Sequence, residues 1–434
     1  MATSPQLFLG IDFGTSGCRA AIVNESGDKL FFQSVPLPKS ICRDSNAVQN
    51  PKDWWKALEK LISDKLNSKL KSHVAAMAVN GTSSSLLLCD DKGEPLTPCL
   101  MYNDYRAKEE AKRIIDLVPK GFSAIKSANS ALAKLLYLHQ RCLNATYALH
   151  QADWLSNRLA NNYGHSDRNN CLKMGYDPEL NEWPGFIDEL LTNKSLLPKV
   201  HQTGTVIGTI DTNIADQLGL PRDAKVTAGT TDTVAAAYAA GAAMPGDAVT
   251  SLGSTLAIKI VSESPVASEN YGIYSHPYFG KWLVGGASNS GGAVLLEYFT
   301  LDEIKQLSTS INPDVDSGLN YYPLPRPGER FPIANPNQQP KLTPRPESDA
   351  LFLQGMFEGI ANIEAIAYAR LRELGTNPIQ RLISTGGGNL NPYWRRIRER
   401  KLGLQFIEPI SNEAAYGTAL FARDGYFSQP NQRN

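Results

Sequence analysis

The feature that most constrains the fold is a unit of strand, glycine turn and strand that occurs twice. The first unit spans residues 7–24, with its turn at Gly14-Thr-Ser-Gly17, and a third strand is expected at 29–33. The second unit spans residues 248–261, with its turn at Gly253-Ser-Thr255. The two antiparallel units are separated by about 240 residues, which favours a fold with two related halves.

Length and composition limit the classes of protein that fit. At about 150 residues per domain, 434 residues correspond to two or three domains. Apolar residues make up 42% and charged residues 20%, as in soluble globular proteins. The 43 Lys and Arg balance the 43 Asp and Glu, so no excess positive field is available for nucleic acid or an anionic membrane. The most apolar stretch, 235–244, is too short for a membrane span of about 20 residues.

Cysteine usage and the N-terminus bear on the compartment. The six cysteines lie in the first 171 residues without a C-x-x-C pair, and the six histidines show no H-E-x-x-H spacing. These patterns favour structural roles and a reducing compartment. The N-terminus has no basic, serine-rich or apolar leader, so no targeting segment is readable, although a cleaved one is compatible with this start.

The periodicity of apolar residues predicts an α/β protein. Strands at 74–79 and 381–384 alternate with helices. The expected helices are 51–70, 107–117, 130–142, 152–159, 232–243, 291–299, 352–374 and 392–401. Eight of the 27 prolines fall in 323–346, which predicts an extended excursion within the second half rather than a linker.

The first glycine turn has the composition of a phosphate site. Gly14 and Gly17 are expected to leave backbone N–H groups uncovered, and Thr15 and Ser16 add hydroxyl donors. Asp12 precedes the turn and is placed to hold Mg²⁺, because magnesium prefers one or two carboxylates plus phosphate oxygens. The alternative is an ordinary hairpin whose aspartate caps its own backbone.

Two later loops have related compositions. Ser251-Leu-Gly-Ser-Thr255 repeats the glycine and hydroxyl pattern and would hold a polyphosphate from the other side, although a plain hairpin is the alternative. Ser384-Thr-Gly-Gly-Gly-Asn389 ends a strand in three glycines. Such a run is entropically costly unless something lies against bare backbone, and an adenine ring is a candidate.

Asp232 follows a Gly-Thr-Thr turn at the start of an alanine-rich helix. Free N–H groups and the helix dipole stabilise a carboxylate there, so an N-cap is one explanation. If a sugar hydroxyl docks against it, the carboxylate is a general base that positions the hydroxyl and takes its proton late. Other nucleotide scaffolds are unsupported. Asp12-Phe-Gly14 matches the D-F-G tripeptide of protein kinases, but no H-R-D loop or V-A-I-K strand precedes it, and P-loop and Rossmann motifs are missing.

These four loops, in this order, resemble the FGGY carbohydrate kinases. The segments at 12–16, 252–255 and 386–394 are similar to the family's two phosphate motifs and its adenosine motif. Four further segments resemble the S-x-x-x-K-L-x-W helix at 130–137, the G-E-R-x-P segment at 328–332, the E-G helix at 358–360 and the G-x-A-L helix at 415–420. Together they cover nearly the whole chain.

The resemblance implies a two-domain α/β protein of the actin-like ATPase (ribonuclease H-like) fold with an interdomain cleft. It implies an N-terminal sugar-binding domain at 1–230 and a C-terminal nucleotide-binding domain at 231–434. Packing of the last helix, about 412–425, back on the first domain is compatible with this division.

The resemblance also implies roles for individual residues, with ATP and Mg²⁺ as cofactors. Asp232 is the expected catalytic base, and Asp12 the expected metal ligand. The expected sugar ligands are Asp12, Ser83, Ser84, Asp104 and Asp232. The expected nucleotide ligands are Gly14, Thr15, Ser16, Gly253, Ser254, Thr255, Gly291, Gly386, Gly387 and Asn389. For Asp104, an ion pair with Arg106 that buttresses the pocket is weighed slightly above direct sugar contact.

The expected substrate depends on the loop after strand 74–79. This loop reads Gly81-Thr-Ser-Ser-Ser85 where xylulose kinases have Gln-Met-His-Gly, so small hydroxyl donors replace bulky side chains. The loop and the compact length look most like the D-ribulose kinases of plants and cyanobacteria. We therefore expect ATP-dependent phosphorylation of a ketopentose, most simply D-ribulose to D-ribulose 5-phosphate, with measurable ATP hydrolysis in the absence of sugar.

Several alternatives stay open at this point. A xylulose or other polyol kinase of the same family is one, and a degenerate, non-catalytic nucleotide sensor is another, although the intact Asp12 and Asp232 argue against the sensor. Sugar stereochemistry is open, as is the choice between monomer and homodimer. A plant relative would work in the chloroplast stroma after loss of a transit peptide, and a bacterial one in the cytoplasm.

Overall fold

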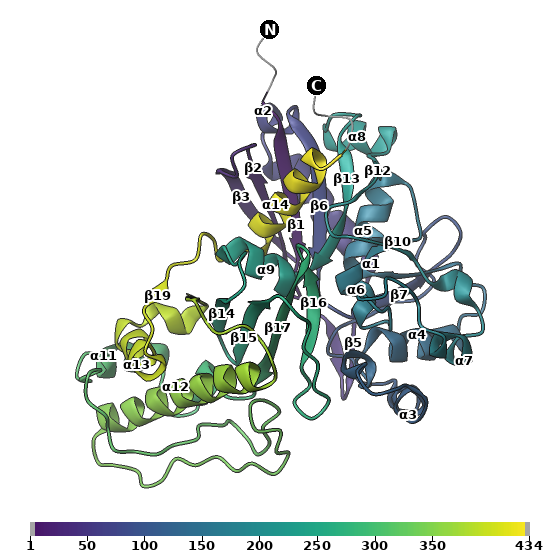
Figure 1. The fold of residues 1–434 in the computed structure, drawn as a ribbon. Coiled ribbons are helices and arrows are strands. Elements are labelled where there is room, and N and C mark those ends of the chain that lie inside the picture. Colours follow the sequence, from purple (N-terminus) through teal and green to yellow (C-terminus); the bar gives the residue numbers. More distant parts are fainter. Residues whose placement is uncertain (1–4, 430–434) are drawn as a thin grey trace. The chain divides into compact units, whose positions relative to one another are not determined.

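The computed structural model describes residues 5–429, which divide into two compact units (Figure 1). Within that range, unit 1 holds residues 5–239 and 413–429, and unit 2 holds residues 240–412. The first unit thus extends past the boundary expected at residue 230. The reason is that the helix beginning at Asp232 buries its small residues, such as Ala239, in a core cluster of unit 1.

Unit 1 is built on a six-stranded sheet. In spatial order the strands are β12 (Val206–Thr209), β13 (Lys225–Thr231), β6 (Val74–Gly81), β1 (Leu7–Phe13), β2 (Gly17–Val23) and β3 (Lys29–Pro36). β13, β6 and β1 are parallel neighbours, whereas β1, β2 and β3 form the expected antiparallel meander. β1 is buried at every position, which explains its continuous apolar run, since a strand covered on both faces need not alternate.

The last helix packs directly on this sheet. α14 (Ala414–Phe427) lies against β1 (Figure 1), and a Cβ at Gly10 would be 2.1 Å from the backbone nitrogen of Ala419. On α14, a Cβ at Gly417 would be 2.0 Å from the carbonyl oxygen of Ala235, which lies on α9 (Asp232–Ala240). Glycine at both positions therefore allows backbones to approach without intervening side chains.

A second, five-stranded sheet completes the core of unit 1. Its order is β4 (Ile41–Arg43), β5 (Asn46–Gln49), β8 (Cys99–Leu100), β7 (Leu86–Cys89) and β9 (Tyr147–His150). Leucines of β7 share a buried cluster with α3 (Lys108–Leu117) and α4 (Ala131–His139). The remaining elements of unit 1 are α1 (Pro51–Lys60), η1 (Leu61–Lys65), α2 (Ser68–Lys71), η2 (Ser123–Ile125), α5 (Gln151–Ala160), β10 (His165–Asp167), α6 (Arg168–Leu172), α7 (Phe186–Leu190), η3 (Lys194–Leu196), β11 (Lys199–His201) and α8 (Thr212–Leu218).

The helix expected over 51–70 is interrupted. After α1 the chain forms the π-helical turn η1, and Leu66 then adopts an extended conformation. Asn67 begins a new helix, because its side chain accepts a hydrogen bond from the backbone N–H of Leu70. Apolar periodicity continues across this break, so periodicity alone predicted one helix.

Unit 2 repeats the arrangement of the first sheet. Its strand order is β16 (Tyr274–Tyr278), β17 (Lys281–Ser288), β15 (Leu256–Ser262), β14 (Asp247–Leu252), β18 (Arg381–Thr385) and β19 (Phe406–Ile407). β14 and β15 are antiparallel and β18 runs parallel to β14, as β1 and β2 are antiparallel and β6 runs parallel to β1. The helical elements of unit 2 are α10 (Gly292–Leu295), α11 (Leu301–Ser308), α12 (Asp349–Glu373), η4 (Gly387–Leu390) and α13 (Pro392–Leu402). The two related halves expected from the sequence are present, although α10 is shorter than the expected helix 291–299.

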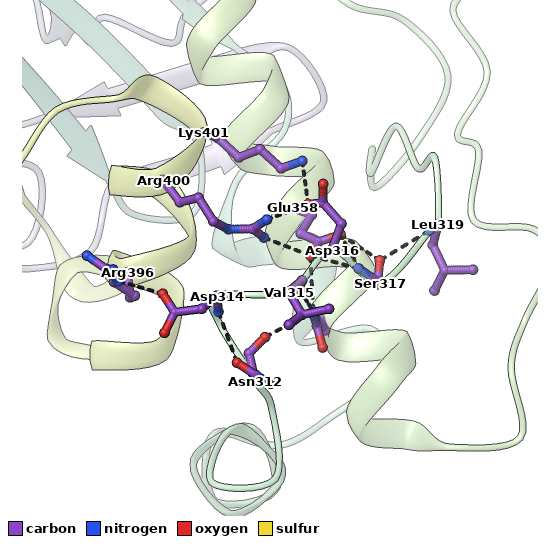
Figure 2. Close-up of polar contacts among 11 residues, drawn as sticks. Asn312, Asp314, Val315, Asp316, Ser317, Leu319, Glu358, Arg396, Arg400 and Lys401 are labelled. Carbon is purple, nitrogen blue, oxygen red and sulfur yellow. Dashed lines mark hydrogen bonds and ion pairs between the residues drawn. The ribbon is translucent and has the colours of Figure 1, made fainter.

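The glutamate of the E-G pattern anchors a loop of unit 2, as Figure 2 shows. Glu358 is 2% exposed and accepts hydrogen bonds from the backbone nitrogen and Oγ of Ser317, at 3.1 and 2.5 Å. Arg400 on α13 bonds both Glu358, at 3.2 Å, and Asp316, at 2.7 Å. The further ion pairs of the loop are Asp316 with Lys401 and Asp314 with Arg396. The pattern therefore has a structural function here, tying residues 312–319 to α12 and α13.

Two findings bear on the expectations about the cysteines and about membrane spans. All six cysteines are free thiols. Across residues 5–429, every helix is too short or too polar to cross a bilayer.

Candidate active site

Three adjacent parallel strands of unit 1 end at the same edge of the sheet and carry the expected sugar site (Figure 1). In the strand register, Asp12 of β1 lies opposite Asn80 of β6, and Thr231 of β13 lies opposite Gly81 of β6. The loop at 82–85 and Asp232 follow directly after these residues. Ligands bind at the carboxyl ends of strands in open α/β sheets, so this edge has the expected location for a site.

Asp12 is almost completely buried, at 5% exposure, and lies near a second carboxylate. Its Oδ2 accepts a hydrogen bond from Nη1 of Arg19 at 3.0 Å. Burial raises the pKa of Asp12 to about 6, the negative charge of Asp232 adds to this increase, and Arg19 opposes it. A desolvated carboxylate beside another carboxylate favours a cation at this point.

Arg19 was not identified from the sequence. It pairs with Asp12 across the β1–β2 hairpin. A short turn after Asp12 was the available signal, because it fixes which β2 residue lies opposite. A Cβ at Gly14 would lie 3.1 Å from the guanidinium of Arg19, so the two residues are close neighbours.

The turn after β1 differs in one respect from the expected phosphate cradle. The N–H of Gly14 donates to the carbonyl of Gly17 at 3.1 Å, so the expectation that Gly14 leaves its amide uncovered is wrong. This bond closes the turn. The carbonyl of Thr15 accepts from Nε2 of Gln49 at 2.8 Å, and Gln49 is itself held by Trp54 Nε1 at 2.8 Å. Gln49 and Trp54 thus hold the turn in place through its backbone. Phosphate binding by Thr15 and Ser16 stays a prediction.

The loop at residues 82–85, here called the serine loop, has two residues that form hydrogen bonds within the protein and two whose hydroxyls have no partner among residues 5–429. Thr82 donates from its backbone N and from Oγ1 to Oε1 of Gln151, both at 2.9 Å. Ser85 Oγ lies 2.5 Å from Thr82 Oγ1 and accepts from the backbone N of Tyr102 at 3.0 Å. The buried hydroxyls of Ser83 and Ser84 have no hydrogen-bond partner within residues 5–429. Buried polar atoms are rarely left in this state, so these two hydroxyls are candidate ligand donors.

Gln151 is a second residue that sequence reasoning missed. It is fully buried at the start of α5, and its Nε2 has no partner among the described residues. Since its Oε1 already holds Thr82, the amide hydrogens lie beside the serine loop. No local motif marks this glutamine, because its partner is about 70 residues away in the chain.

Asp104 is engaged by protein groups on both carboxylate oxygens. The guanidinium of Arg106 bonds it at 2.7 to 3.1 Å, and the backbone N of Ala47 donates to Oδ2 at 2.7 Å. The carboxylate is fully buried. This geometry favours the ion-pair interpretation over direct sugar contact.

Asp232 begins α9 and is half-buried. Its Oδ1 accepts from the backbone N of Thr233 at 2.7 Å and from the Thr233 hydroxyl at 3.2 Å. The carboxylate is therefore held at the strand edge by hydrogen bonds from the residue that follows it.

In unit 2, the second glycine turn packs against the segment after β17. Gly253 N–H donates to Thr255 O at 3.1 Å, and Gly292 N–H donates to Gly253 O at 2.8 Å. Gly291 has φ 153°, and a Cβ there would lie 2.6 Å from the carbonyl oxygen of Ser254. The structure thus brings Gly291 together with the 253–255 turn.

The three glycines after β18 have different environments. A Cβ at Gly386, where φ is +86°, would lie 2.6 Å from the carbonyl of Leu252, and one at Gly388 would lie 2.5 Å from the Leu252 side chain. Protein packing therefore accounts for these two glycines. A Cβ at Gly387 would meet no atom of the described chain within 4 Å, and Oδ1 of Asn389 is buried without a partner there. Gly387 and Asn389 are the members of this loop that are open to a ligand.

The donor set at the sheet edge fits magnesium. Across residues 5–429, no three His, Cys, Asp or Glu side chains cluster as a metal site. Mg²⁺ does not need such a cluster, because it keeps several waters and takes one or two carboxylates with phosphate oxygens. The buried Asp12 carboxylate beside Asp232 meets that requirement.

Comparison with known proteins decides the family. Residues 7–239, more than half of the chain, match the N-terminal domain of the FGGY family of carbohydrate kinases. The chain belongs to this family.

Individual FGGY kinases align over most of their length. A gluconokinase from Bacillus subtilis is 22% identical, covering 94% of this chain and 85% of its own. A xylulose kinase from Streptomyces coelicolor is 26% identical, covering 97% and 88%. The crystal structure of a xyloylose kinase from Brucella ovis superposes with a TM-score of 0.88 at 21% identity, covering 97% and 91%.

These comparisons establish the class of enzyme. The fold is the actin-like ATPase fold of the FGGY kinases, built from two α/β units. The chain is a carbohydrate kinase, a phosphotransferase of a family that transfers phosphate from ATP to a sugar.

Proposed function

We propose that this FGGY kinase phosphorylates a ketopentose, with D-ribulose as the preferred acceptor and D-ribulose 5-phosphate as the product. The observation that supports the proposal is the pair of unpartnered hydroxyls of Ser83 and Ser84 within the described chain, on a loop beside Asp12 and Asp232. Small hydroxyl side chains suit the several hydroxyls of an open-chain sugar, because each can both donate and accept.

We assign the catalytic roles as follows. Asp232 accepts the proton of the terminal sugar hydroxyl, and Asp12 binds the sugar and holds Mg²⁺. When bound, Mg²⁺ neutralises phosphate charge, which is a large part of phosphoryl-transfer catalysis. The phosphates are bound by Thr15, Ser16, Gly253, Ser254 and Thr255, and the adenosine by Gly387 and Asn389, with Gly291 nearby.

A coupled assay with ribulose, xylulose, ribitol, glycerol, gluconate and a no-sugar control tests the substrate. We expect the highest kcat/KM with D-ribulose and a measurable rate of ATP hydrolysis without sugar, since water then occupies the acceptor position. A higher kcat/KM with xylulose or gluconate would reverse the substrate assignment. These two sugars are included because relatives of this chain are named as xylulose kinase and gluconokinase.

The assignment of Asp232 as base has its own test. Asp232→Asn keeps the size of the side chain and an oxygen that can accept the hydrogen bonds from Thr233, but removes its basicity. We expect nucleotide affinity to be unchanged and turnover to slow by a factor of about 100 or more, the order that general-base catalysis supplies. Turnover at the wild-type rate would exclude Asp232 as the base, and the absence of phosphate transfer by the wild type to any sugar would favour the sensor.

A further inference from the structure

A buried lysine of unit 1 has no part in the mechanism given so far. Lys134 lies on α4 with no solvent exposure, within the S-x-x-x-K-L-x-W segment. Its Nζ donates to the backbone carbonyl of Ser84 at 2.8 Å and to that of Met101 at 2.7 Å. The serine of the same segment, Ser130, caps α4 by accepting from Ala133 N at 3.2 Å. The cap at Ser130 fixes where α4 begins and therefore also fixes the position of Lys134 on the helix.

The lysine acts on an unusual point of the backbone. Ser84 has φ +69°, in the left-handed region that residues with a side chain rarely occupy. Such conformations persist where surrounding contacts hold them, and they concentrate at functional sites. The ammonium is bonded to the carbonyl of this residue, whose own hydroxyl has no partner in the described chain.

The second acceptor of Lys134 extends the support to the neighbouring segment. Met101 precedes Tyr102, whose backbone N donates to Ser85 Oγ. Lys134 and Ser85 thus join the serine loop to the segment that carries Asp104. The positive charge is costly at this depth, since burial lowers the pKa of Lys134 to about 7, with Asp104 opposing the shift. An apolar side chain would fill the space without this cost, so the two hydrogen bonds are the contribution specific to lysine.

We propose that Lys134 is a positioning residue for sugar recognition, which holds Ser84 in the left-handed conformation and so directs the hydroxyls of Ser83 and Ser84 to the acceptor sugar. This inference rests on the proposed function, because it assumes that the serine loop binds the acceptor. It assigns to the lysine an effect on sugar affinity and none on nucleotide affinity.

A double-mutant cycle between Lys134→Met and Ser84→Ala tests the proposal. We expect each single variant to raise the KM for D-ribulose about tenfold or more, with the KM for ATP changed less than about twofold. If Lys134 acts through Ser84, the double variant has a ribulose KM close to that of the worse single variant. Effects that multiply in the double variant, or a Lys134→Met variant with unchanged ribulose KM, would overturn the proposal.

Two control variants separate positioning from loss of stability. Leu138→Ala, at a buried leucine one turn further along α4, lowers the melting temperature and leaves the ribulose KM unchanged. Lys112→Met, at an exposed lysine on α3, removes a charge and changes neither quantity. If Lys134→Met does not fold, Lys134→Leu replaces it, because leucine also lacks a hydrogen-bond donor. A wild-type ribulose KM in that variant would count equally against the proposal.

Failure of the substrate assignment is distinguishable from failure of this inference. The dissociation constant of the sugar in the absence of nucleotide is measured by calorimetric titration for the same four proteins of the cycle. If the wild type prefers gluconate or xylulose, the proposed substrate is wrong, and the cycle is repeated with that sugar as the probe. Multiplicative effects with the preferred sugar would then refute the positioning role alone.

Discussion

Asp12 combines two opposing requirements at the scale of a single residue. The metal and sugar binding that we propose for Asp12 requires an ionised carboxylate, whereas burial and the neighbouring Asp232 disfavour its ionisation. Arg19 supplies one hydrogen bond that limits the cost. The ionised form of Asp12 is therefore unfavourable in the unliganded protein. Functional sites commonly lower the stability of the fold in this way.

This strain predicts a pH-dependent effect of Asp12→Asn on stability. The folded-state pKa of about 6 lies above the ordinary 3.8, so the native state binds the proton more tightly and loses stability as pH rises from about 4 to about 6. At about 1.4 kcal/mol per unit, the full shift corresponds to about 3 kcal/mol. The shift already includes the opposing effect of Arg19, so we expect the variant to be about 1–3 kcal/mol more stable than wild type at pH 7.

The measurement is denaturant unfolding in EDTA at pH 4.5 and pH 7. The stability difference between Asp12→Asn and wild type should grow between these two values, and phosphoryl transfer by the variant should be lost. Asp91→Asn, at an exposed loop carboxylate, is the matched control and should show the same small difference at both values. A difference that does not change with pH would contradict the burial argument.

At the scale of elements, glycine loops show where sequence reasoning succeeds and fails. The two strand–turn–strand units were predictable, because alternation and glycine turns are local signals. The reason for the three glycines after β18 was not, because two of them are fixed by Leu252, more than 130 residues earlier in the chain. Gln151 and Lys134 were missed for the same reason, since their partners are distant in the chain. Arg19 was missed although its partner Asp12 lies opposite it in the same hairpin.

The differing environments of these glycines predict different effects of alanine. Gly386→Ala forces a Cβ against the Leu252 carbonyl at positive φ, so we expect a loss of about 1–3 kcal/mol in unfolding free energy. Gly387→Ala meets no atom within 4 Å, so stability should change by less than about 0.5 kcal/mol. If adenosine lies against Gly387, the KM for ATP rises several-fold in this variant while the ribulose KM is unchanged. An unchanged KM for ATP would remove Gly387 from the nucleotide site.

At the scale of the whole molecule, the two units repeat one topology but differ in the chemistry of their loops. Unit 1 presents carboxylates and hydroxyls at the ends of β1, β6 and β13. Unit 2 presents glycine-rich backbone after β14 and β18. Carboxylates and hydroxyls suit a polyol, and bare backbone suits phosphate and a flat base. The repeated scaffold thus carries loops of different chemistry in the two units.

This difference in loop chemistry predicts that the sugar and the nucleotide protect different loops from hydrogen exchange. D-ribulose alone should slow amide exchange in 82–85 and at the start of α9, because ligand contacts suppress local opening there. ADP with Mg²⁺ should slow exchange in 253–255, 290–293 and 386–390, and in the turn at 14–16 to a smaller extent. L138A is again a suitable reference, since it loosens α4 without altering either surface. Protection of the 386–390 loop by sugar alone, or of the serine loop by nucleotide alone, would show that the assignment of ligands to units is wrong.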